Sequence, residues 1–138
     1  MADARPVRKQ PETLRLRDIA PGFTVHDLQK SMAFYVDALG FSVDERWENE
    51  GELRGVMLRA GRCRIGLSQD DFAKGRDRAK GLGMSIWLTT VQDLQKVVAR
   101  IKKNGIVLEQ ELAEMPWGGR AFALTDPDGF KLTFTSEG

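Results

Sequence analysis

Residues that commonly carry out chemistry are scarce in this sequence. His26 is the only histidine among the 138 residues, and Cys63 is the only cysteine. An imidazole can act as a general base or bind a metal near neutral pH. One histidine and one cysteine, however, make neither a metal site nor a disulfide without further partners. His26 therefore has three interpretations: a turn or surface residue, a contact to a ligand, or a general base.

His26 lies in one copy of a repeated motif. V-H-D-L-Q-K near the start of the chain recurs as V-Q-D-L-Q-K near its middle. A strand-like run with partial apolar alternation precedes each copy, and an apolar stripe of helical spacing follows each aspartate. We therefore expect Asp27 and Asp93 to cap two helices, which end near Gly40 and Gly105.

Each half continues with three further strand-like segments. They are residues 41–48, 55–60 and 62–68 in the first half, and residues 106–111, 120–125 and 130–135 in the second. The last two segments are joined by D-P-D-G, which suits a hairpin turn because proline and glycine favour its second and later positions.

These elements predict an α+β fold. Two βαβββ repeats, about residues 15–70 and 82–137, are expected to form curved mixed sheets around a cavity, with the helices outside. Together they make a single domain, residues 15–138. The polar, proline-containing residues 1–14 are expected to form a flexible N-terminal arm.

Composition argues against charged polymers and membranes as partners. The chain has 21 basic and 20 acidic residues and a formal net charge of +1. No apolar run approaches the length of a membrane span, and the lone cysteine suits a reducing compartment. We expect a cytoplasmic protein that binds neither nucleic acid nor membrane.

Strand parity indicates which side chains line the cavity, because alternate residues of a strand share a face. Small or polar residues are expected there, with Ile86 and Leu88 forming an apolar wall and Trp87 in the core. The candidate ligand contacts are Thr24, His26, Trp47, Met57, Arg59, Ser68, Trp117 and Thr133. For Trp47 and Trp117, contact with a ligand, contact with a second subunit and local packing remain open.

Two longer motifs connect the chain to a known family. V-H-D-L-Q-K-S-M-A-F-Y-V-D-A-L-G-F and P-W-G-G-R-A-F-A-L-T-D-P-D-G-F-K-L-T-F resemble the vicinal oxygen chelate superfamily, which includes glyoxalase I, extradiol dioxygenases, and fosfomycin and bleomycin resistance proteins. The resemblance covers residues 16 to 136 and is closest in motif to the bleomycin-resistance branch. It implies a homodimer in which each subunit completes the cleft of the other.

The resemblance also identifies where the metalloenzymes of this superfamily hold a divalent ion. The corresponding positions here are Ala20, Gly66, Ile86 and Thr133, and none offers an imidazole or a carboxylate. We therefore expect a metal-free protein without a cofactor or catalytic residues, which binds a small organic ligand and sequesters a drug or metabolite as bleomycin resistance proteins do. The alternatives are a lyase, isomerase or dioxygenase of the same superfamily with an atypical active site, in which His26, Tyr35 or an acidic side chain acts, and a scaffold with a vestigial pocket.

Overall fold

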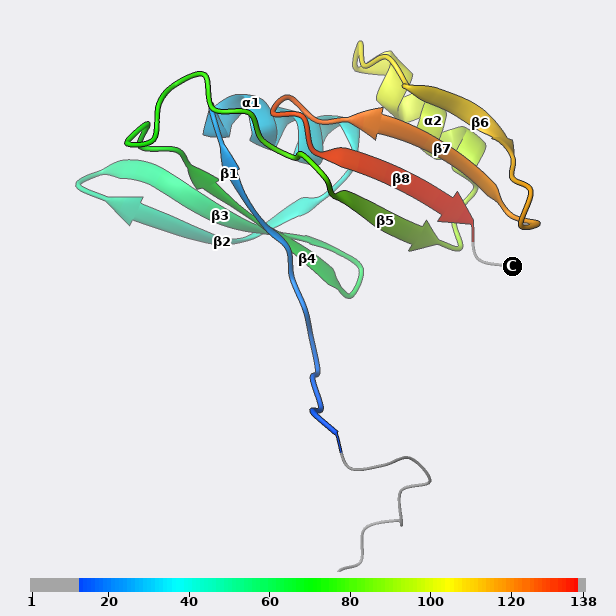
Figure 1. Ribbon diagram of the computed structural model, residues 1–138, viewed down its shortest axis with the longest axis horizontal. Helices are drawn as coiled ribbons and strands as arrows, with labels where there is room; N and C mark the ends of the chain where they lie inside the picture. Colours follow the sequence, from blue (N-terminus) through cyan, green and yellow to red (C-terminus); the bar gives the residue numbers. More distant parts are fainter. Residues whose placement is uncertain (1–12, 137–138) are drawn as a thin grey trace, which may run out of the picture.

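The computed structural model describes residues 13–136 and shows two halves of the same element order (Figure 1). The first half consists of β1 (Gly22–Val25), α1 (Leu28–Met32), a π-helical continuation η1 (Ala33–Ala38), β2 (Ser42–Asn49), β3 (Glu52–Ala60) and β4 (Cys63–Gln69). The second half consists of β5 (Ser85–Thr90), α2 (Leu94–Lys103), β6 (Gln110–Glu114), β7 (Arg120–Thr125) and β8 (Lys131–Ser136). The predicted α+β class and the two βαβββ repeats are confirmed. Residues 1–12 of the expected flexible arm lie outside the described part of the chain.

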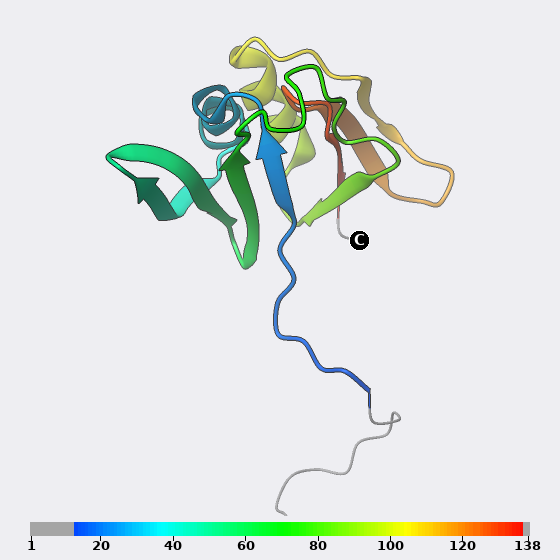
Figure 2. The ribbon, with the colours of Figure 1, turned by 60° about the vertical axis from the view of Figure 1, so that its left-hand side comes forward.

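Each half forms one mixed sheet of four strands. The strand orders are β1-β4-β3-β2 and β5-β8-β7-β6, and the pairs β1–β4 and β5–β8 are parallel. Both helices lie on the same side of the two sheets (Figures 1 and 2). We call the opposite face of each sheet its open face.

Both helices begin where the aspartate of the repeated motif predicted. The Asp27 carboxylate accepts hydrogen bonds from the N–H groups of Gln29 and Lys30, and Asp93 accepts one from Gln95. Each helical segment ends shortly before a glycine with positive φ, Gly40 or Gly105, as expected for residues that end helices in the left-handed region.

Aromatic packing joins the two halves on the helix side of the sheets. The ring of Phe23 in β1 stacks on Phe130, which precedes β8, with centroids 4.1 Å apart. Tyr35, Phe122 and Leu132 are fully buried in the same core. Burial of such large apolar side chains is the main driving force for folding, and because this core is shared, the two halves stabilise one another.

One predicted strand differs in position. Residues 106–109 were expected to begin a strand, but β6 begins at Gln110. Leu108 is nevertheless buried, and the N–H of Glu109 donates a 2.8 Å hydrogen bond to the carbonyl of Ala123 in β7. The apolar pattern thus marked a segment that packs on the core before it joins the ladder.

Candidate ligand site

A tryptophan and three small residues form a row across the open face of the first sheet. Trp47, Gly55, Ser68 and Thr24 are neighbours in the register of the four strands. The Trp47 ring lies directly over Gly55, because a Cβ added to that glycine would be 3.0 Å from the indole Cε3. Three predicted contacts, Trp47, Ser68 and Thr24, are therefore brought together.

The next rows of this open face become progressively charged. Met57 lies opposite Gly66, which in turn pairs with Gly22. Beyond them Arg59 forms a 3.1 Å ion pair with Asp44. The predicted contacts Met57 and Arg59 thus share the open face, but the guanidinium of Arg59 already has a carboxylate partner.

A second ion pair closes this end of the sheet. Arg64, which is opposite Arg59 in the ladder, forms an ion pair with Asp18. The hydrogen bond from Arg64 holds the pKa of the Asp18 carboxyl below its ordinary value. Asp18 precedes β1, so this pair ties the incoming chain to the sheet.

The open face of the second sheet carries a pair of tryptophans. The indole rings of Trp87 and Trp117 have centroids 5.9 Å apart and planes inclined by 51°. Both remain largely exposed, at 57% and 62%. Trp87 lies in register with Thr133, which is opposite Ala123, so the aromatic pair adjoins a floor of short side chains.

Hydroxyl groups continue this floor. The next row contains Thr89, Thr135 and Ala121, and the two threonine hydroxyls lie 3.0 Å apart, within hydrogen-bond distance. A flat molecule resting here would meet an aromatic wall, methyl groups and hydroxyl donors or acceptors. This composition is typical of small-molecule sites.

The position of Trp87 corrects the sequence interpretation. Trp87 was expected in the core, and Ile86 was placed at a cavity position, but Ile86 is half-buried and packs against the core. Two residues, Val91 and Gln92, separate β5 from Asp93, whereas His26 alone separates β1 from Asp27. The extra residue inverts the parity of β5 relative to the repeated motif. Leu88, expected to line the cavity, likewise packs against the core.

A tight loop holds Trp117. The N–H of Met115 donates to the carbonyl of Gly119 at 2.7 Å, and the N–H of Gly118 donates to the carbonyl of Met115 at 3.0 Å. Gly118 has φ of +101°, a conformation that favours glycine. A Cβ added to Gly119 would lie 3.6 Å from the indole nitrogen of Trp117, so the ring lies beside its own loop.

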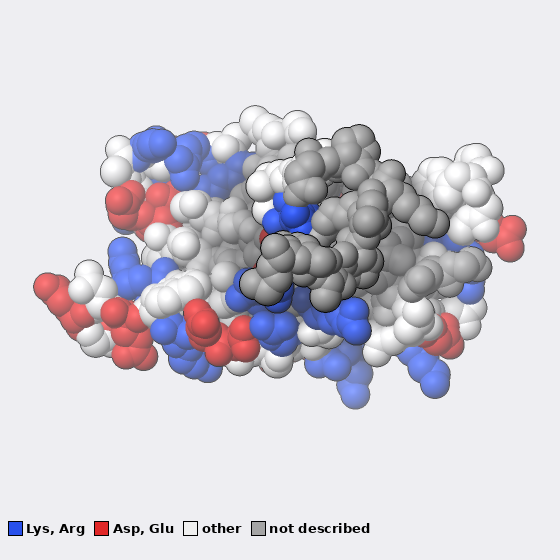
Figure 3. All heavy atoms as spheres, turned by 90° about the horizontal axis from the view of Figure 1, so that it is seen from below, with Lys and Arg blue, Asp and Glu red and all other residues white. Residues whose placement is uncertain are grey.

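Charged side chains surround the open faces without a single sign prevailing. Viewed from that side of the molecule, Lys, Arg, Asp and Glu side chains are interspersed along the rim (Figure 3). Within residues 13–136, no helix has the length and apolar character needed to cross a membrane.

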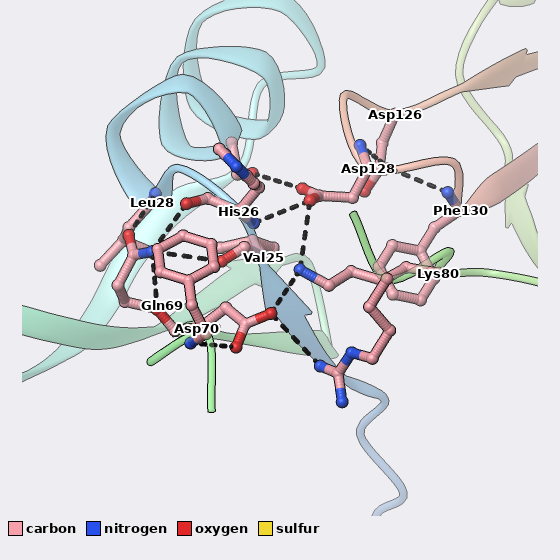
Figure 4. A network of polar contacts seen from close by, with 12 residues as sticks. Val25, His26, Leu28, Gln69, Asp70, Lys80, Asp126, Asp128 and Phe130 are labelled. Carbon is pink, nitrogen blue, oxygen red and sulfur yellow. Dashed lines mark hydrogen bonds and ion pairs between the residues drawn. The ribbon is translucent and has the colours of Figure 1, made fainter. Parts of the chain in front are cut away.

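His26 lies in the loop after β1 and is held by its main chain. Its N–H donates a 2.7 Å hydrogen bond to Asp128, and its carbonyl accepts one of 2.7 Å from Gln69 (Figure 4). Its imidazole contacts the ring of Phe72 edge-on, with centroids 4.9 Å apart. His26 is thus placed against the segment that connects the two halves. Its expected contact with a ligand stays a prediction.

A buried charge network lies next to this loop. Nζ of Lys80 is 2.9 Å from Asp70 and 3.8 Å from Asp128, and all three side chains are less than a tenth exposed. The hydrogen bond from Lys80, and that from the Phe72 N–H, hold the pKa of Asp70 below its ordinary value. Sequence reasoning missed this network, and only the D-P-D-G motif, which contributes Asp128, pointed toward it.

A separate hollow of about 560 Å³ lies on the outer end of the first sheet. It is lined by Gln29, Glu52, Leu53, Arg54, Gln69, Asp70, Asp71 and Phe72. None of the predicted ligand contacts belongs to it. The predicted contacts are distributed instead over the two open faces, with His26 apart.

The residues of the open faces do not fit a divalent ion. In the structure Gly66 lies beside Gly22, and Thr133 lies beside Trp87, so the paired first and last strands offer one hydroxyl and no imidazole or carboxylate. Within residues 13–136, no group of three or more His, Cys, Asp or Glu side chains is arranged to hold a metal. Ala20 precedes β1 and Ile86 faces the core, and neither side chain can be a ligand.

Comparison with protein families gives one match over most of the chain. The model described as Glyoxalase/Bleomycin resistance protein/Dioxygenase superfamily matches residues 17–134. No curated protein matches the chain.

Several solved structures share the fold. A superfamily member from Sphaerobacter thermophilus DSM 20745 is 24% identical, with a TM-score of 0.72, over 89% of this chain and 98% of that one. TioX from Micromonospora sp. ML1 is 20% identical, with a TM-score of 0.71, over 86% and 97%. A virulence protein from Salmonella typhimurium is 22% identical, with a TM-score of 0.66, over 92% and 100%. At these identities the likeness concerns the fold.

Proposed function

The chain belongs to the glyoxalase/bleomycin resistance protein/dioxygenase superfamily, and from this premise we propose that it is a metal-free, cytoplasmic binding protein for a flat organic molecule. The protein sequesters a drug or metabolite rather than converting it. The single observation that carries this proposal is the exposed pair Trp87 and Trp117 beside a floor of threonine and alanine on the open face of the second sheet.

The geometry of the pair favours stacking on its outer surface. With centroids 5.9 Å apart and planes inclined by 51°, the two rings leave no parallel slot for a third ring between them. An incoming aromatic system would stack on the exposed face of one indole and touch the edge of the other, which are both favourable arrangements. Hydroxyl groups of Thr133 and Thr135 would then set its orientation.

A homodimer would complete the site. The open face of the first sheet carries Trp47, which is 45% exposed, beside Ser68 and Thr24. Two copies that face each other with their open sides would place Trp47 of the partner subunit opposite Trp87 and Trp117. Exposed tryptophans on both open faces support this arrangement, because large apolar surface left in water is unfavourable.

The proposal is tested by calorimetric titration with three flat probes of different charge: neutral quinoxaline, cationic ethidium and anionic 1-naphthalenesulfonate. At least one is expected to bind the wild type. Trp87→Leu and Trp117→Leu should each weaken that binding about tenfold, since an aromatic contact contributes on the order of 1 kcal/mol beyond its area. Val107→Ala, a change at a side chain 86% exposed elsewhere on the surface, is the matched control and should have no effect.

Two results would count against the proposal. Binding of no probe, or binding that both leucine variants retain, would show that the aromatic pair is not the site. Elemental analysis after incubation with Mn²⁺, Fe²⁺, Ni²⁺ and Zn²⁺ addresses the metal-dependent alternative. About one metal ion per chain, lost on His26→Ala, would mean that the protein must be assayed as a lyase, isomerase or dioxygenase.

A further inference from the structure

Residues 13–20, the leading segment, leave the body of the protein on the side of the open faces, away from both helices (Figures 1 and 2). Two contacts set the direction in which the segment leaves. The N–H of Gly66 donates a 2.9 Å hydrogen bond to the carbonyl of Pro21, and Asp18 forms its ion pair with Arg64. The segment is thus anchored at its base and points outward.

The outer part of the leading segment is apolar where it meets water. Leu14 is 82% exposed, Leu16 64% and Ile19 82%. Leu14 and Leu16 are two positions apart, and Arg15 and Arg17 lie between and after them. In extended backbone the two leucines share one face and the arginines the other. This alternation is typical of a strand that covers an apolar surface.

A suitable acceptor lies on the second sheet. β5 is an edge strand that pairs with β8, so its other edge presents backbone N–H and C=O groups that can accept another strand. Exposed apolar side chains flank that edge, namely Trp87 on the open face and Met84, 44% exposed, just before the strand. Residues 13–18 in extended form span roughly 20 Å, about the length of the six residues of β5.

We infer that the leading segment is exchanged between two copies of this chain. In the homodimer, residues 13–18 of each subunit add as a strand to the outer edge of the other subunit's β5, with Leu14 and Leu16 beside Trp87 of the partner subunit. This rests on the dimer of the proposed function and adds a wall to the same ligand site, contributed in trans. Backbone pairing supplies the affinity and the two leucines the specificity, as in other cases of strand addition.

The size of the exchanged surface supports a second copy as the occupant. An extended segment of eight residues with three large apolar side chains removes on the order of 400 Å² from water, and it covers a similar area on its acceptor. Two reciprocal segments would therefore bury on the order of 1,600 Å², which is the size of a standard stable interface. Docking on β5 of its own subunit would require the segment to turn back from the direction that Asp18 and Arg64 impose.

The experiment combines sedimentation velocity with amide hydrogen exchange on the full-length protein. The wild type is expected to sediment as a dimer, with amides of β5 protected. The double variant Leu14→Asp/Leu16→Asp should sediment as a monomer, and exchange in β5 should become at least about tenfold faster. The control Val107→Asp introduces the same charge at an exposed valine distant from both surfaces and should behave as the wild type.

Each outcome is decisive. A wild-type monomer, a leucine variant that remains dimeric, or exchange in β5 that is equally fast in wild type and variant would overturn the exchange. Protection of β5 in a monomer would show that the segment docks on its own subunit and would overturn it as well. Calorimetry with the three flat probes separates the two proposals: a segment-dependent dimer that binds no probe retains the exchange and rejects the function, and a probe-binding protein with unaltered assembly does the reverse.

Discussion

The hydroxyl of Tyr35 donates a 2.7 Å hydrogen bond to Oδ2 of Asp126, which is 91 positions away in the sequence. Tyr35 belongs to η1 of the first half, and Asp126 begins the β7–β8 turn of the second. The other carboxylate oxygen accepts hydrogen bonds from the N–H groups of Asp128 and Phe130, both at 2.9 Å. One buried carboxylate therefore holds the turn and joins the two halves.

Replacement of Tyr35 by phenylalanine should destabilise the protein without changing its shape. The change removes the donor to Oδ2 and leaves a buried acceptor unsatisfied, which costs about 1–3 kcal/mol of unfolding free energy. Burial already raises the pKa of Asp126, and the hydrogen bond from Tyr35 counteracts this rise. Urea denaturation followed by far-UV circular dichroism measures the loss. An unfolding free energy equal to that of the wild type would mean that the bond does not hold the halves together.

Two glycines of the connecting segment offer a matched test of packing. Gly81 and Gly83 both have positive φ, +74° and +71°, but a Cβ at Gly81 would lie 2.4 Å from the carbonyl oxygen of Gly129, whereas at Gly83 it meets nothing within 4 Å. Gly83→Ala should cost about 1–2 kcal/mol through backbone strain alone. Gly81→Ala must also displace the segment from the turn and should cost at least about 3 kcal/mol.

Thermal unfolding of both alanine variants gives the comparison. Equal losses of stability would show that the connecting segment does not pack against the turn. A much larger loss for Gly81→Ala would show that it does, and that the turn and the segment form one unit.

The fold could be predicted from local patterns because both halves use the same signals. Asp27 and Asp93 each precede an apolar helical stripe, and the side chains confirm that each aspartate caps a helix. The turn at D-P-D-G was likewise expected and is found, with Gly129 at φ of +100°. These features depend on contacts within a few residues, which a sequence displays directly.

The candidate site was less accessible to sequence reasoning because it depends on register. Three predicted residues, Trp47, Ser68 and Thr24, fall in one row, since β1, β3 and β4 keep the expected parity. Trp87 was assigned to the core because the repeated motif was used to set the parity of β5, and one extra residue before Asp93 reverses it. Parity counted back from a distant motif fails whenever the intervening loop changes length by one.

Lys80 illustrates a second kind of failure. A lysine in a polar segment normally lies in water, yet this one is 8% exposed and contacts Asp70 and Asp128. Its partners come from the first half and from the β7–β8 turn, so no local pattern relates them. Such networks follow from the tertiary packing and are seen only in the structure.

The ion pair between Lys80 and Asp70 should make stability depend on acid pH. The hydrogen bond from Lys80 lowers the pKa of Asp70 below its ordinary value of 3.8. The unfolded chain therefore takes up a proton at a higher pH than the folded protein does, and the stabilisation by Asp70 is present above about pH 3.8 and lost as the pH falls through the folded-state pKa. Asp70→Asn should lower the melting temperature at neutral pH and converge with the wild type in strong acid.

Melting temperatures measured from about pH 7 down to about pH 2.5 provide this comparison. Asp71→Asn is the control, because Asp71 accepts a hydrogen bond from the N–H of Ala73 but has no described ion pair with Lys80. A constant difference between wild type and Asp70→Asn at all these pH values would contradict the assignment.

The arrangement of the two tryptophans on the second sheet can be verified without any ligand. Indoles with centroids 5.9 Å apart and planes inclined by 51° are close enough for their electronic transitions to couple, which produces a paired positive and negative band in the far-UV circular dichroism spectrum. Trp87→Leu and Trp117→Leu should each abolish the same pair of bands, because coupling needs both rings. Trp47→Leu, which removes an indole on the other sheet, should leave them unchanged. If the bands survive either of the first two changes, the rings do not form the pair on which the ligand site depends.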